Sequence, residues 1–473
     1  MTDPIATFTA IVGPSQILTG ADAARYGVDA TGHYPCRPRA VLRPADTAEV
    51  AAILRHAHAT GTAIVPSGGR TGLTGGTHAE GEVILSLERL NRIRDIRPAT
   101  RTAVAEAGVV IATLHDRAAA LDLDFPLWFG ARGSATVGGV LSTNAGGSNV
   151  LRHGNARALC LGIEAVLADG RVLDLMSALH KDNSGYDLRD LLIGAEGTLA
   201  VITAATLRLV PAARARATAV VGMRALDPAL ALLNRLQEAS GGLVEAFEYM
   251  PASYQERLRL RRPDLGLNFD RIHPVTILVE LGATAPRDAT PEADGSLPLR
   301  GLLTGALQSL IEDGTIDDAV IATSEQQRRA IWARREAAAE ITFGAGPTID
   351  TDIALPLDRV TEFLARIEPQ LQRLDPGAQS ITVAHLGDGN LHYTALPTRA
   401  DPALHDAVVE AVEDIVADLG GSFSAEHGVG LSKRATMARR KDPVALDVMR
   451  AIKAALDPKG ILNPGKVLPP RGA

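Results

Sequence analysis

The sequence predicts an α+β protein with two regions of different pattern, and three observations lead to this fold class. Residues 40–121 alternate short apolar runs with amphipathic segments, which is typical of a sheet covered by helices. Asp169-Gly170 separates two apolar runs and is a strong hairpin signal. Residues 226–419 alternate helical segments with apolar runs, which indicates an antiparallel sheet with helices on one face.

The elements of the first region follow its apolar runs. Strands are expected at 40–42, 63–65, 83–87 and 103–105, and helices at 46–59 and 110–121. A hairpin over 161–175 and a strand over 199–210 complete the region, and Pro211 ends the strand. The Arg-containing stretch 214–216 reads as a solvent-facing connector, so we place a domain boundary near residue 212.

The second region is expected to alternate helices with strands. They are predicted at 226–239, 302–313, 324–341, 357–374 and 402–419, with a strand at 275–281 and a hairpin at 380–395. Asp401 is the expected N-cap of the last helix, because Pro402 suits the first helical position. Residues 284–298 carry Pro, Asp and Gly and are predicted to form a surface loop.

Composition excludes several classes of protein. The chain has 473 residues, 46% of them hydrophobic and 22% charged, which is typical of a globular protein. Its net charge of −7 gives no basic footprint for nucleic acid. Two cysteines exclude a disulfide scaffold and a Cys-rich metal site. No signal peptide and no long apolar span are apparent, so a cytoplasmic protein is expected, with a peripheral membrane contact left open.

Two glycine-rich segments lie in the first region. Pro66–Thr77 contains five Gly in twelve residues and follows an apolar strand, so its backbone N–H groups can converge on a phosphate. It matches neither the P-loop nor the Rossmann fingerprint, and a long mobile turn is the alternative. Gly130–Gly147 combines glycines with Ser134, Thr143 and Asn144. Two such loops in one domain could hold the two ends of a diphosphate.

Two histidine-containing motifs lie in the second region. His385 and His392 flank a Gly-Asp-Gly-Asn turn, which brings two imidazoles close together and favours a transition metal, above all Zn²⁺. Glu426 could add a carboxylate, and two His with one carboxylate leave open positions, as in a catalytic site. His427 would then be an imidazole beside the metal, suited to proton abstraction. The alternative is an N-cap-like turn with Glu426 and His427 solvated.

Together these segments resemble the FAD-dependent D-2-hydroxyacid dehydrogenases, the group of D-lactate, D-2-hydroxyglutarate and glycolate oxidase FAD subunits within the vanillyl-alcohol oxidase-type flavoproteins. The resemblance runs over about residues 25–470 and includes Lys181–Leu188, Ile193–Thr198 and Asn463–Lys466. It implies a two-lobed FAD-binding domain of the VAO/PCMH type at 1–211, a cap domain with an antiparallel sheet and helices at 212–430, and a C-terminal segment, 431–473, that returns to the FAD domain.

The resemblance also implies roles for individual residues. The metal ligands would be His385, His392 and Glu426, the base His427, and the residue that holds the substrate carboxylate Arg335, within Trp332–Glu336. Glu196, Gly197 and Ile202 would flank the adenine, and Asn463 would approach the isoalloxazine. FAD is expected to be non-covalent, because Pro66–Gly76 contains no His. The implied flavin-binding positions are Pro66, Gly68, Gly69, Arg70, Thr71, Gly72, Leu73, Gly75, Gly76, Gly130, Ser134, Gly138, Gly139, Thr143, Asn144, Gly146, Gly147, Glu196, Gly197, Ile202 and Asn463.

Three positions depart from the D-2-hydroxyglutarate members, which resemble one another in having Thr, Lys and Asn where this chain has Ala339, Asp350 and Thr394. A second substrate carboxylate would meet an Asp instead of a Lys, which is unfavourable. We therefore expect FAD-dependent oxidation of a monocarboxylic, D-lactate-like D-2-hydroxy acid, assisted by Zn²⁺ or another divalent transition metal. The alternatives are a D-2-hydroxyglutarate dehydrogenase with an altered pocket, a non-catalytic FAD-binding subunit, and a zinc hydrolase. The electron acceptor (an electron-transfer flavoprotein, a quinone or a cytochrome) and a homodimer stay open.

Overall fold

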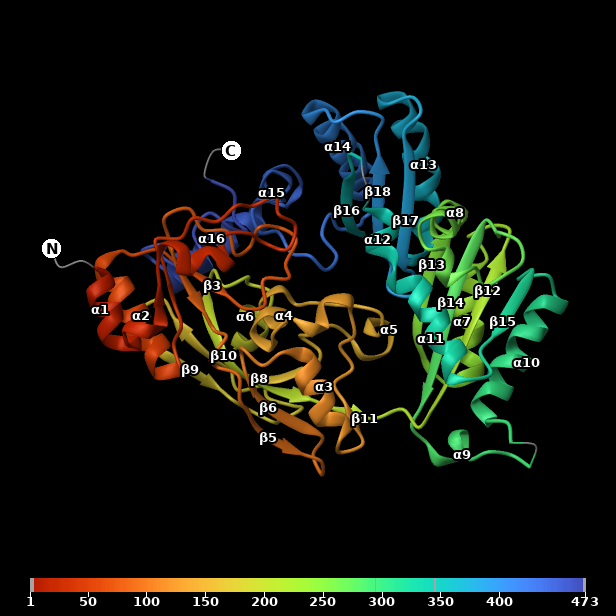
Figure 1. Cartoon of the computed structure of the whole chain (residues 1–473), viewed down its shortest axis with the longest axis horizontal. Helices are drawn as coiled ribbons and strands as arrows, with labels where there is room; N and C mark the ends of the chain where they lie inside the picture. Colours follow the sequence, from red (N-terminus) through yellow and green to blue (C-terminus); the bar gives the residue numbers. More distant parts are fainter. Residues whose placement is uncertain (1–3, 294, 344–345, 471–473) are drawn as a thin grey trace. The chain divides into compact units, whose positions relative to one another are not determined.

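The computed structural model describes residues 4–293, 295–343 and 346–470, which divide into two compact units (Figure 1). The first unit comprises the residues through Gly146, Gly154–Pro211 and the residues from Glu426 on. The second comprises Gly147–His153 and Ala212–Ala425. The chain therefore enters the long part of the second unit after Pro211 and leaves it after Ala425.

The first unit contains a small, mostly parallel sheet whose strand order is β1-β2-β4-β3. Its strands are β1 (Ile17–Leu18), β2 (Ala40–Leu42), β3 (Ile64–Ser67) and β4 (Val83–Ser86). Helices α1 (Pro4–Val12) and α2 (Thr47–Thr60) pack together beside this sheet. Helix α2 begins where the Asp46 side chain accepts a hydrogen bond from the Glu49 N–H, and it ends at Gly61, which takes the left-handed conformation that favours glycine.

A second, fully antiparallel sheet of the first unit has the order β5-β6-β10-β8-β9. Its strands are β5 (Ile93–Arg97), β6 (Thr102–Glu106), β8 (Cys160–Leu167), β9 (Val172–Leu175) and β10 (Ala200–Arg208). The pairing of β8 with β9 confirms the predicted Asp169-Gly170 hairpin. The unit also contains β7 (Leu123–Asp124), β11 (Val210–Pro211), α3 (Ile111–Ala119), α4 (Val137–Thr143), α6 (Leu188–Leu192), α15 (Arg434–Arg440) and α16 (Pro443–Leu456).

The second unit is built on a seven-stranded antiparallel sheet of order β15-β12-β14-β13-β17-β18-β16. The strands are β12 (Ala215–Met223), β13 (Val244–Pro251), β14 (Val275–Ala283), β15 (Asp318–Ile321), β16 (Ile349–Ala354), β17 (Gln379–His385) and β18 (Asn390–Leu396). Its helices are α5 (Val150–His153), α7 (Ala229–Ser240), α8 (Ala252–Arg261), α9 (Pro286–Ala289), α10 (Pro298–Glu312), α11 (Glu325–Glu336), α12 (Ala338–Thr342), α13 (Val360–Leu374) and α14 (Pro402–Asp418).

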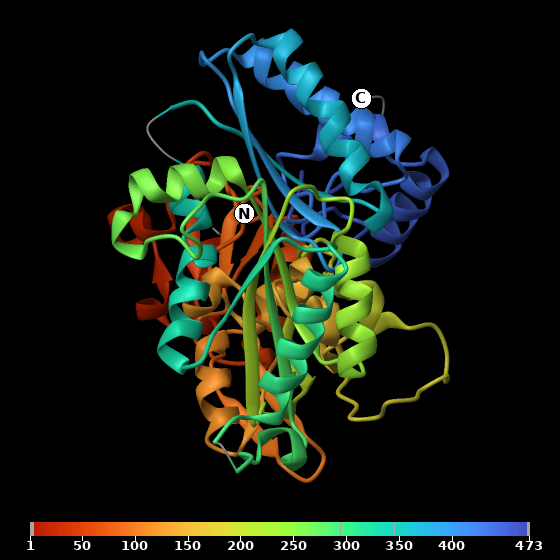
Figure 2. The same cartoon turned by 90° about the vertical axis from the view of Figure 1, so that its right-hand side faces the viewer.

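One face of this sheet, which we call the apolar face, packs against α7, α10, α13 and α14 in the largest core of the protein. Figure 2 shows α13 and α14 lying along the β17–β18 hairpin. The strand residues on this face alternate with those of the opposite face, as strand geometry requires. The strand residues of the apolar face include Ala217, Ala219, Val221, Phe247, Tyr249, Ile277, Val279, Leu281, Ile353, Leu391 and Tyr393.

The opposite face, which we call the polar face, carries Glu245, Glu248 and Glu280 together with His385, His392 and Asp352. It is not bare of helices, so the expectation of helices on one face only is wrong. The polar face also contains an apolar patch formed by the strand residues Val220, Met250 and Leu278. This patch is covered by α8, α11 and α12. The α+β fold class is confirmed.

Two local predictions also need correction. The stretch 214–216 is not a solvent-facing connector, because β12 begins at Ala215 and the Arg216 guanidinium lies 3.6 Å from a Glu280 carboxylate oxygen. The single helix expected over 324–341 is divided into α11 and α12 at Ala337. The predicted surface loop 284–298 contains the short helix α9, and its residue 294 lies outside the described residues. In the described part of the chain, no helix has the length and apolarity needed to cross a bilayer.

Candidate functional site

The histidine hairpin of the second unit places two imidazoles on the polar face. His385 ends β17 and pairs in register with Asn390, whereas His392 pairs with Val383, so both side chains leave the same face two positions apart. Their ring centroids lie 5.5 Å apart and nearly perpendicular. The turn between them requires glycine at Gly389, where φ is +81° and a Cβ atom would stand 2.2 Å from the Leu355 carbonyl oxygen.

A buried carboxylate, Glu248, links His385 to the residue expected to hold the substrate carboxylate. Its Oε1 lies 2.9 Å from His385 Nδ1, and its Oε2 lies 2.8 Å from Arg335 Nη2. Glu248 is 1% exposed and Arg335 8% exposed. Burial raises the pKa of Glu248, but the charges of His385 and Arg335 outweigh it, so the pKa is lowered overall. The carboxylate is therefore held in its ionised form.

Arg335 comes from α11, which lies over the polar face. The helix begins at Ser324, whose hydroxyl accepts the Gln327 N–H. Arg328, Trp332 and Arg335 follow one another at helical spacing and so lie on one side of the helix. The first two donate hydrogen bonds to Glu280 on β14, at distances of 3.0 and 2.8 Å. These contacts attach α11 to β14, and Arg335 makes a separate contact with Glu248 on β13.

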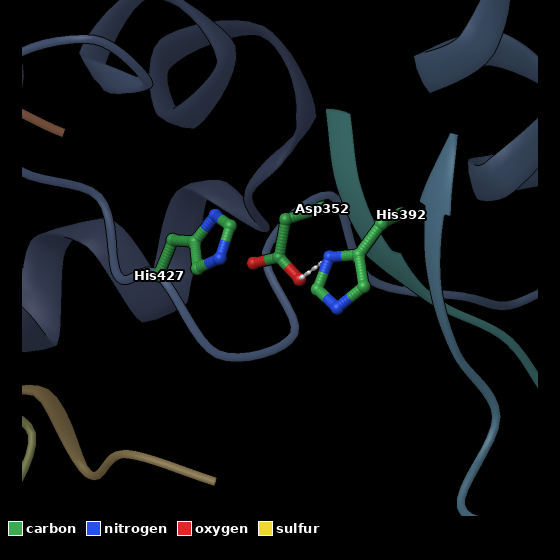
Figure 3. Close-up of side chains that lie close together, drawn as sticks. All are labelled: Asp352, His392 and His427. Carbon is green, nitrogen blue, oxygen red and sulfur yellow. Dashed lines mark ion pairs between the residues drawn. The ribbon is translucent and has the colours of Figure 1, made fainter. Parts of the chain in front are cut away.

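Asp352 on β16 is the carboxylate beside the second imidazole, and Figure 3 draws it with His392. The Asp352 Oδ1 lies 3.9 Å from His392 Nδ1 and accepts a hydrogen bond from the Asn390 side chain. Its Oδ2 accepts the backbone N–H of Ala425, at 3.2 Å. Glu426 and His427 follow Ala425 directly in the chain, so their positions are tied covalently to this contact.

Two groups of side chains offer ligand atoms that all lie within 4.8 Å of one another. One is His385, His392 and Glu426, the three residues expected to bind a metal, and the other is Asp352, His392 and His427 (Figure 3). Two imidazoles with a carboxylate are donors that suit zinc and similar transition metals. The donor chemistry thus fits a divalent transition metal.

Glu248 and Asp352 belong to none of the sequence motifs that predict the site. The signal for Glu248 was an acidic residue within the apolar run Val244–Pro251, which forms β13. A buried acid in a strand is unusual unless it is paired.

Asp350 and Thr394, two of the three positions that depart from the D-2-hydroxyglutarate members, form one cross-strand pair on the polar face. They are directly opposite in register, and the Thr394 hydroxyl donates a 2.7 Å hydrogen bond to Asp350 Oδ1. Thr394 is buried and Asp350 is exposed. The third position, Ala339, is exposed on α12.

The two glycine-rich segments of the first unit lie directly against each other. A Cβ atom at Gly68 would stand 2.5 Å from Thr136 Oγ1, and one at Gly69 would stand 2.0 Å from the Ser134 carbonyl oxygen. A Cβ atom at Gly138 would stand 2.7 Å from the Ala107 Cβ. Gly139 follows in α4, where Thr143 donates to its carbonyl oxygen. The close packing therefore leaves no room for a Cβ atom at Gly68, Gly69 or Gly138, whatever the segments bind.

Several expected flavin-binding residues have contacts within the first unit. Asn463 donates through Nδ2 to the carbonyl oxygens of Gly76 and Glu196, at 3.0 and 2.7 Å. The Glu196 carboxylate accepts the backbone N–H groups of Val429 and Gly430, and its pKa is raised because burial outweighs these hydrogen bonds. These contacts join the Ile193–Thr198 motif to the C-terminal segment.

Other residues expected to bind the flavin have different surroundings. The Arg70 guanidinium lies over the Tyr26 ring and donates to the Arg25 carbonyl oxygen, so its observed partners are not an anion. Ile202 is buried in the apolar core around β10. Asn144 caps α4 with positive φ and accepts the Arg157 N–H. Pro66 lies 3.1 Å from a Cβ atom built at Gly197, and Gly75 lies against Tyr34. Thr71 is half-buried, and Gly146 is buried. Gly147 begins the short segment of the second unit. The exposed positions are Gly72, Leu73, Gly130 and Ser134.

Three buried polar atoms on these segments test whether they fit a polar cofactor. Ser67 Oγ, Thr136 Oγ1 and Asn463 Oδ1 have no hydrogen-bond partner among the described residues. Buried polar groups in native proteins are normally paired, so these atoms fit a ligand with hydrogen-bonding groups along the glycine-rich segments. The residues present are thus compatible with a dinucleotide such as FAD.

Comparison with known proteins supports the flavoprotein assignment. A family model described as "FAD binding domain" matches residues 38–176, and one described as "FAD linked oxidases, C-terminal domain" matches residues 212–467. The chain is 37% identical over 434 residues to the mitochondrial D-2-hydroxyglutarate dehydrogenase of Bos taurus, covering 91% of this chain and 77% of that protein. It is 35% identical to the D-2-hydroxyglutarate dehydrogenase of Stutzerimonas stutzeri, covering 99% of each.

Solved structures support the fold. p-Cresol methylhydroxylase with bound substrate matches with a TM-score of 0.74 at 15% identity, covering 98% of this chain and 96% of that one. A 4-ethylphenol oxidase from Gulosibacter chungangensis matches with a TM-score of 0.71 at 19% identity, covering 99% and 97%. The expected VAO/PCMH-type fold and the expected class of FAD-dependent oxidoreductase are thus confirmed, and the chain belongs to the FAD-linked oxidase family.

Proposed function

We propose that the protein oxidises a monocarboxylic D-2-hydroxy acid to the 2-oxo acid, with non-covalent FAD as hydride acceptor and a divalent transition metal, most simply Zn²⁺, at His385, His392 and Glu426. The observation that carries the proposal is the presence of the imidazole pair on the polar face beside a buried arginine of α11, which shares Glu248 with His385. Imidazoles for a metal and a guanidinium for a carboxylate match the two polar groups of a 2-hydroxy acid.

Each residue of the candidate site has its own role in the proposed reaction. Arg335 holds the substrate carboxylate, and its Nε is buried without a hydrogen-bond partner among the described residues, so it can donate to a ligand. His427 accepts the proton of the α-hydroxyl group. His385, His392 and Glu426 would hold the metal. When bound, the metal would lower the pKa of the hydroxyl group as a Lewis acid and FAD would accept the hydride from the α-carbon.

The substrate class follows from the Asp350–Thr394 pair. Both residues lie on the same sheet face as His392, and their 2.7 Å hydrogen bond occupies the cross-strand position next to the Asp352–His392 pair. A substrate with a second carboxylate would approach a fixed negative charge there, and like charges brought together cost several kcal/mol. The pair therefore favours a substrate whose side chain carries no carboxylate.

D-2-hydroxyglutarate is the second candidate, because the relatives named above carry that substrate in their names at 35–37% identity. Anaerobic flavin bleaching separates the two. The purified flavoprotein is mixed with D-lactate, L-lactate, D-2-hydroxyglutarate and L-2-hydroxyglutarate, and the loss of flavin absorbance is followed. We expect D-lactate or a similar monocarboxylic D-acid to bleach fastest. Faster bleaching by D-2-hydroxyglutarate selects the second candidate, and no bleaching by any acid contradicts both.

Exchange of the cross-strand pair tests the basis of the specificity. Asp350→Lys combined with Thr394→Asn should raise kcat/KM for D-2-hydroxyglutarate relative to D-lactate by about 10- to 100-fold, because a repulsive contact becomes an attractive one. Asp350→Asn is the control that removes the charge without adding a new one and should give part of this change. An unchanged ratio in the double variant would mean that the pair does not face the substrate.

A further inference from the structure

One carboxylate on the polar face has two functional partners. Glu248 Oε1 contacts Nδ1 of His385, an expected metal ligand, while Oε2 contacts Nη2 of Arg335, the expected carboxylate holder. All three residues belong to the second unit. Glu248 lies on β13, which is paired on both sides by β14 and β17, so its backbone is held by the interior of the sheet.

The contact with His385 decides which ring nitrogen carries the lone pair that can bind a metal. A carboxylate paired with a guanidinium accepts hydrogen bonds, so the Nδ1–H of His385 donates to it. Nε2 then carries the lone pair that a metal requires. Carboxylates that hold ligating histidines in this way fix the tautomer and the ring orientation, and their loss weakens metal binding.

The contact with Arg335 has the matching effect on the guanidinium. Arg335 is buried, so its orientation depends on the groups that face it inside the protein. Glu248 forms a 2.8 Å ion pair with one end of the planar fork, which anchors that end and leaves Nε to meet a substrate carboxylate. The same side chain thus orients the groups for both ends of a 2-hydroxy acid.

We propose that Glu248 is a positioning residue that couples metal binding at His385 to carboxylate binding at Arg335, an inference that rests on the function proposed above. One carboxylate oxygen fixes the tautomer of the His385 imidazole, and the other anchors the guanidinium group of Arg335. The site therefore has a higher affinity for a 2-hydroxy acid than would follow from binding its hydroxyl group and its carboxylate group independently.

Glutamine at this position can satisfy only one partner. If the amide oxygen of Glu248→Gln accepts from His385, the NH₂ group faces the donors of Arg335. If the oxygen turns to Arg335, the NH₂ group donates to His385 Nδ1 and forces the tautomer that protonates Nε2. Either orientation disturbs one of the two groups while the size of the side chain is kept.

The sheet also provides a matched control, Glu280 on the adjacent strand β14. Glu280 is buried on the same face and is held by Arg328 and Trp332 of the same helix α11, as well as by the Thr218 hydroxyl. Within the part of the chain that the structure describes, the partners of Glu280 include no expected metal ligand; they are Thr218, Arg216, Arg328 and Trp332. Glu280→Gln therefore reproduces the loss of a buried charge under α11 without changing the contacts of His385.

The test uses the full-length, FAD-loaded protein with Glu248→Gln, Glu248→Asp and Glu280→Gln. Zn²⁺ affinity is measured by competition with a chromogenic chelator, and kcat and KM are measured with the 2-hydroxy acid that bleaches the wild-type flavin. We expect Glu248→Gln to weaken Zn²⁺ binding by about 10- to 100-fold and to raise KM at saturating Zn²⁺. Glu280→Gln should change the Zn²⁺ affinity and KM each by less than about threefold, even if it lowers the melting temperature as much as Glu248→Gln does. Glu248→Asp should recover part of the Zn²⁺ affinity that Glu248→Gln loses.

Equal effects of Glu248→Gln and Glu280→Gln on Zn²⁺ affinity would overturn the coupling while leaving the proposed function intact. So would a Glu248→Asp variant that binds Zn²⁺ no better than Glu248→Gln. A wild-type protein that oxidises the acid but has no measurable Zn²⁺ affinity would overturn both this inference and the proposed metal site. If Glu248→Gln cannot be purified, Glu248→Asp against Glu280→Gln gives the same comparison.

Discussion

The two faces of the seven-stranded sheet are made from alternate residues of the same strands, yet they differ in what their side chains do. The apolar face buries strand residues such as Val279 and Leu281 against four helices, and its free energy comes from burial of apolar surface. The polar face carries Glu245, Glu248 and Glu280, three buried acids on two neighbouring strands. One face thus stabilises the unit and the other holds the candidate site.

Each of these three glutamates has an arginine partner. Glu245 accepts from Arg152 at 2.8 Å, Glu280 from Arg328, and Glu248 pairs with Arg335. A buried ion pair contributes little net stability, but removal of one partner leaves a desolvated charge and is costly. The polar face thus uses buried ion pairs that fix side-chain positions but add little net stability. The apolar face, by contrast, should tolerate substitutions by apolar side chains of similar volume.

Loss of a ligand on the polar face should have the largest effect of any substitution considered. His385→Ala removes one of three expected metal donors, and turnover should fall by more than about 100-fold, beyond the loss expected for a residue that only supports a ligand. The flavin should stay bound, because the variant does not alter the first unit. Turnover is measured by flavin bleaching, and flavin content by the ratio of absorbance at 450 and 280 nm.

Full activity of His385→Ala with reduced metal content would contradict the metal-assisted mechanism. Loss of flavin together with activity would instead indicate that the hairpin is needed for folding. His405→Ala is the control, since His405 is exposed on α14 and belongs to neither group of ligand atoms.

A matched truncation on the apolar face should affect stability and leave the chemistry unchanged. Phe363 on α13 is fully buried and meets the Tyr393 ring edge-on, at 5.8 Å. Phe363→Ala should lower the free energy of unfolding of the second unit by about 3–5 kcal/mol through lost burial and a cavity. Denaturant unfolding followed by circular dichroism measures the change, and kcat per flavin should remain within about twofold. A large fall in kcat would mean that the two faces are not independent.

The apolar face was the more predictable of the two from sequence. The strand 275–281 and the helix from Pro402 follow from apolar runs and cap residues, and both are present as β14 and α14. The strand that carries Glu248 was not predicted, because two acids in Val244–Pro251 break the alternation of a half-buried strand. A β-bulge at Glu245, where the register between β13 and β14 shifts, moves a second acid onto the polar face.

The candidate site itself was accessible to sequence reasoning only in part. The spacing of His385 and His392 around a glycine-rich turn predicts two adjacent imidazoles, because hairpin geometry is local. Glu248 is 137 residues away from His385 along the chain, and no local pattern records which strands become neighbours in the sheet. The partners that orient the imidazoles therefore come from tertiary structure.

The smallest effect expected is a pH-dependent loss of stability at the bulge. Burial raises the pKa of Glu245, but a hydrogen bond from His153 and the charges of Arg216 and Arg152 outweigh it, so the folded-state pKa lies below the ordinary value of 4.5. Such a group stabilises the folded state above its unfolded pKa, and this contribution is lost as pH falls through the folded pKa. Glu245→Gln should therefore cost about 1–3 kcal/mol at pH 7, less than complete removal of a partner, because the amide keeps the shape and one acceptor.

The difference in unfolding free energy between wild type and Glu245→Gln should stay constant from pH 7 to about pH 5 and shrink below pH 4.5. Denaturant unfolding at a series of pH values measures it, and Asp406→Asn on the exposed surface of α14 is the control that should show no such trend. A difference that grew as the pH fell would mean that Glu245 is protonated in the folded protein. The polar face would then bury a neutral acid at the bulge, and its three buried glutamates would no longer be equivalent in charge.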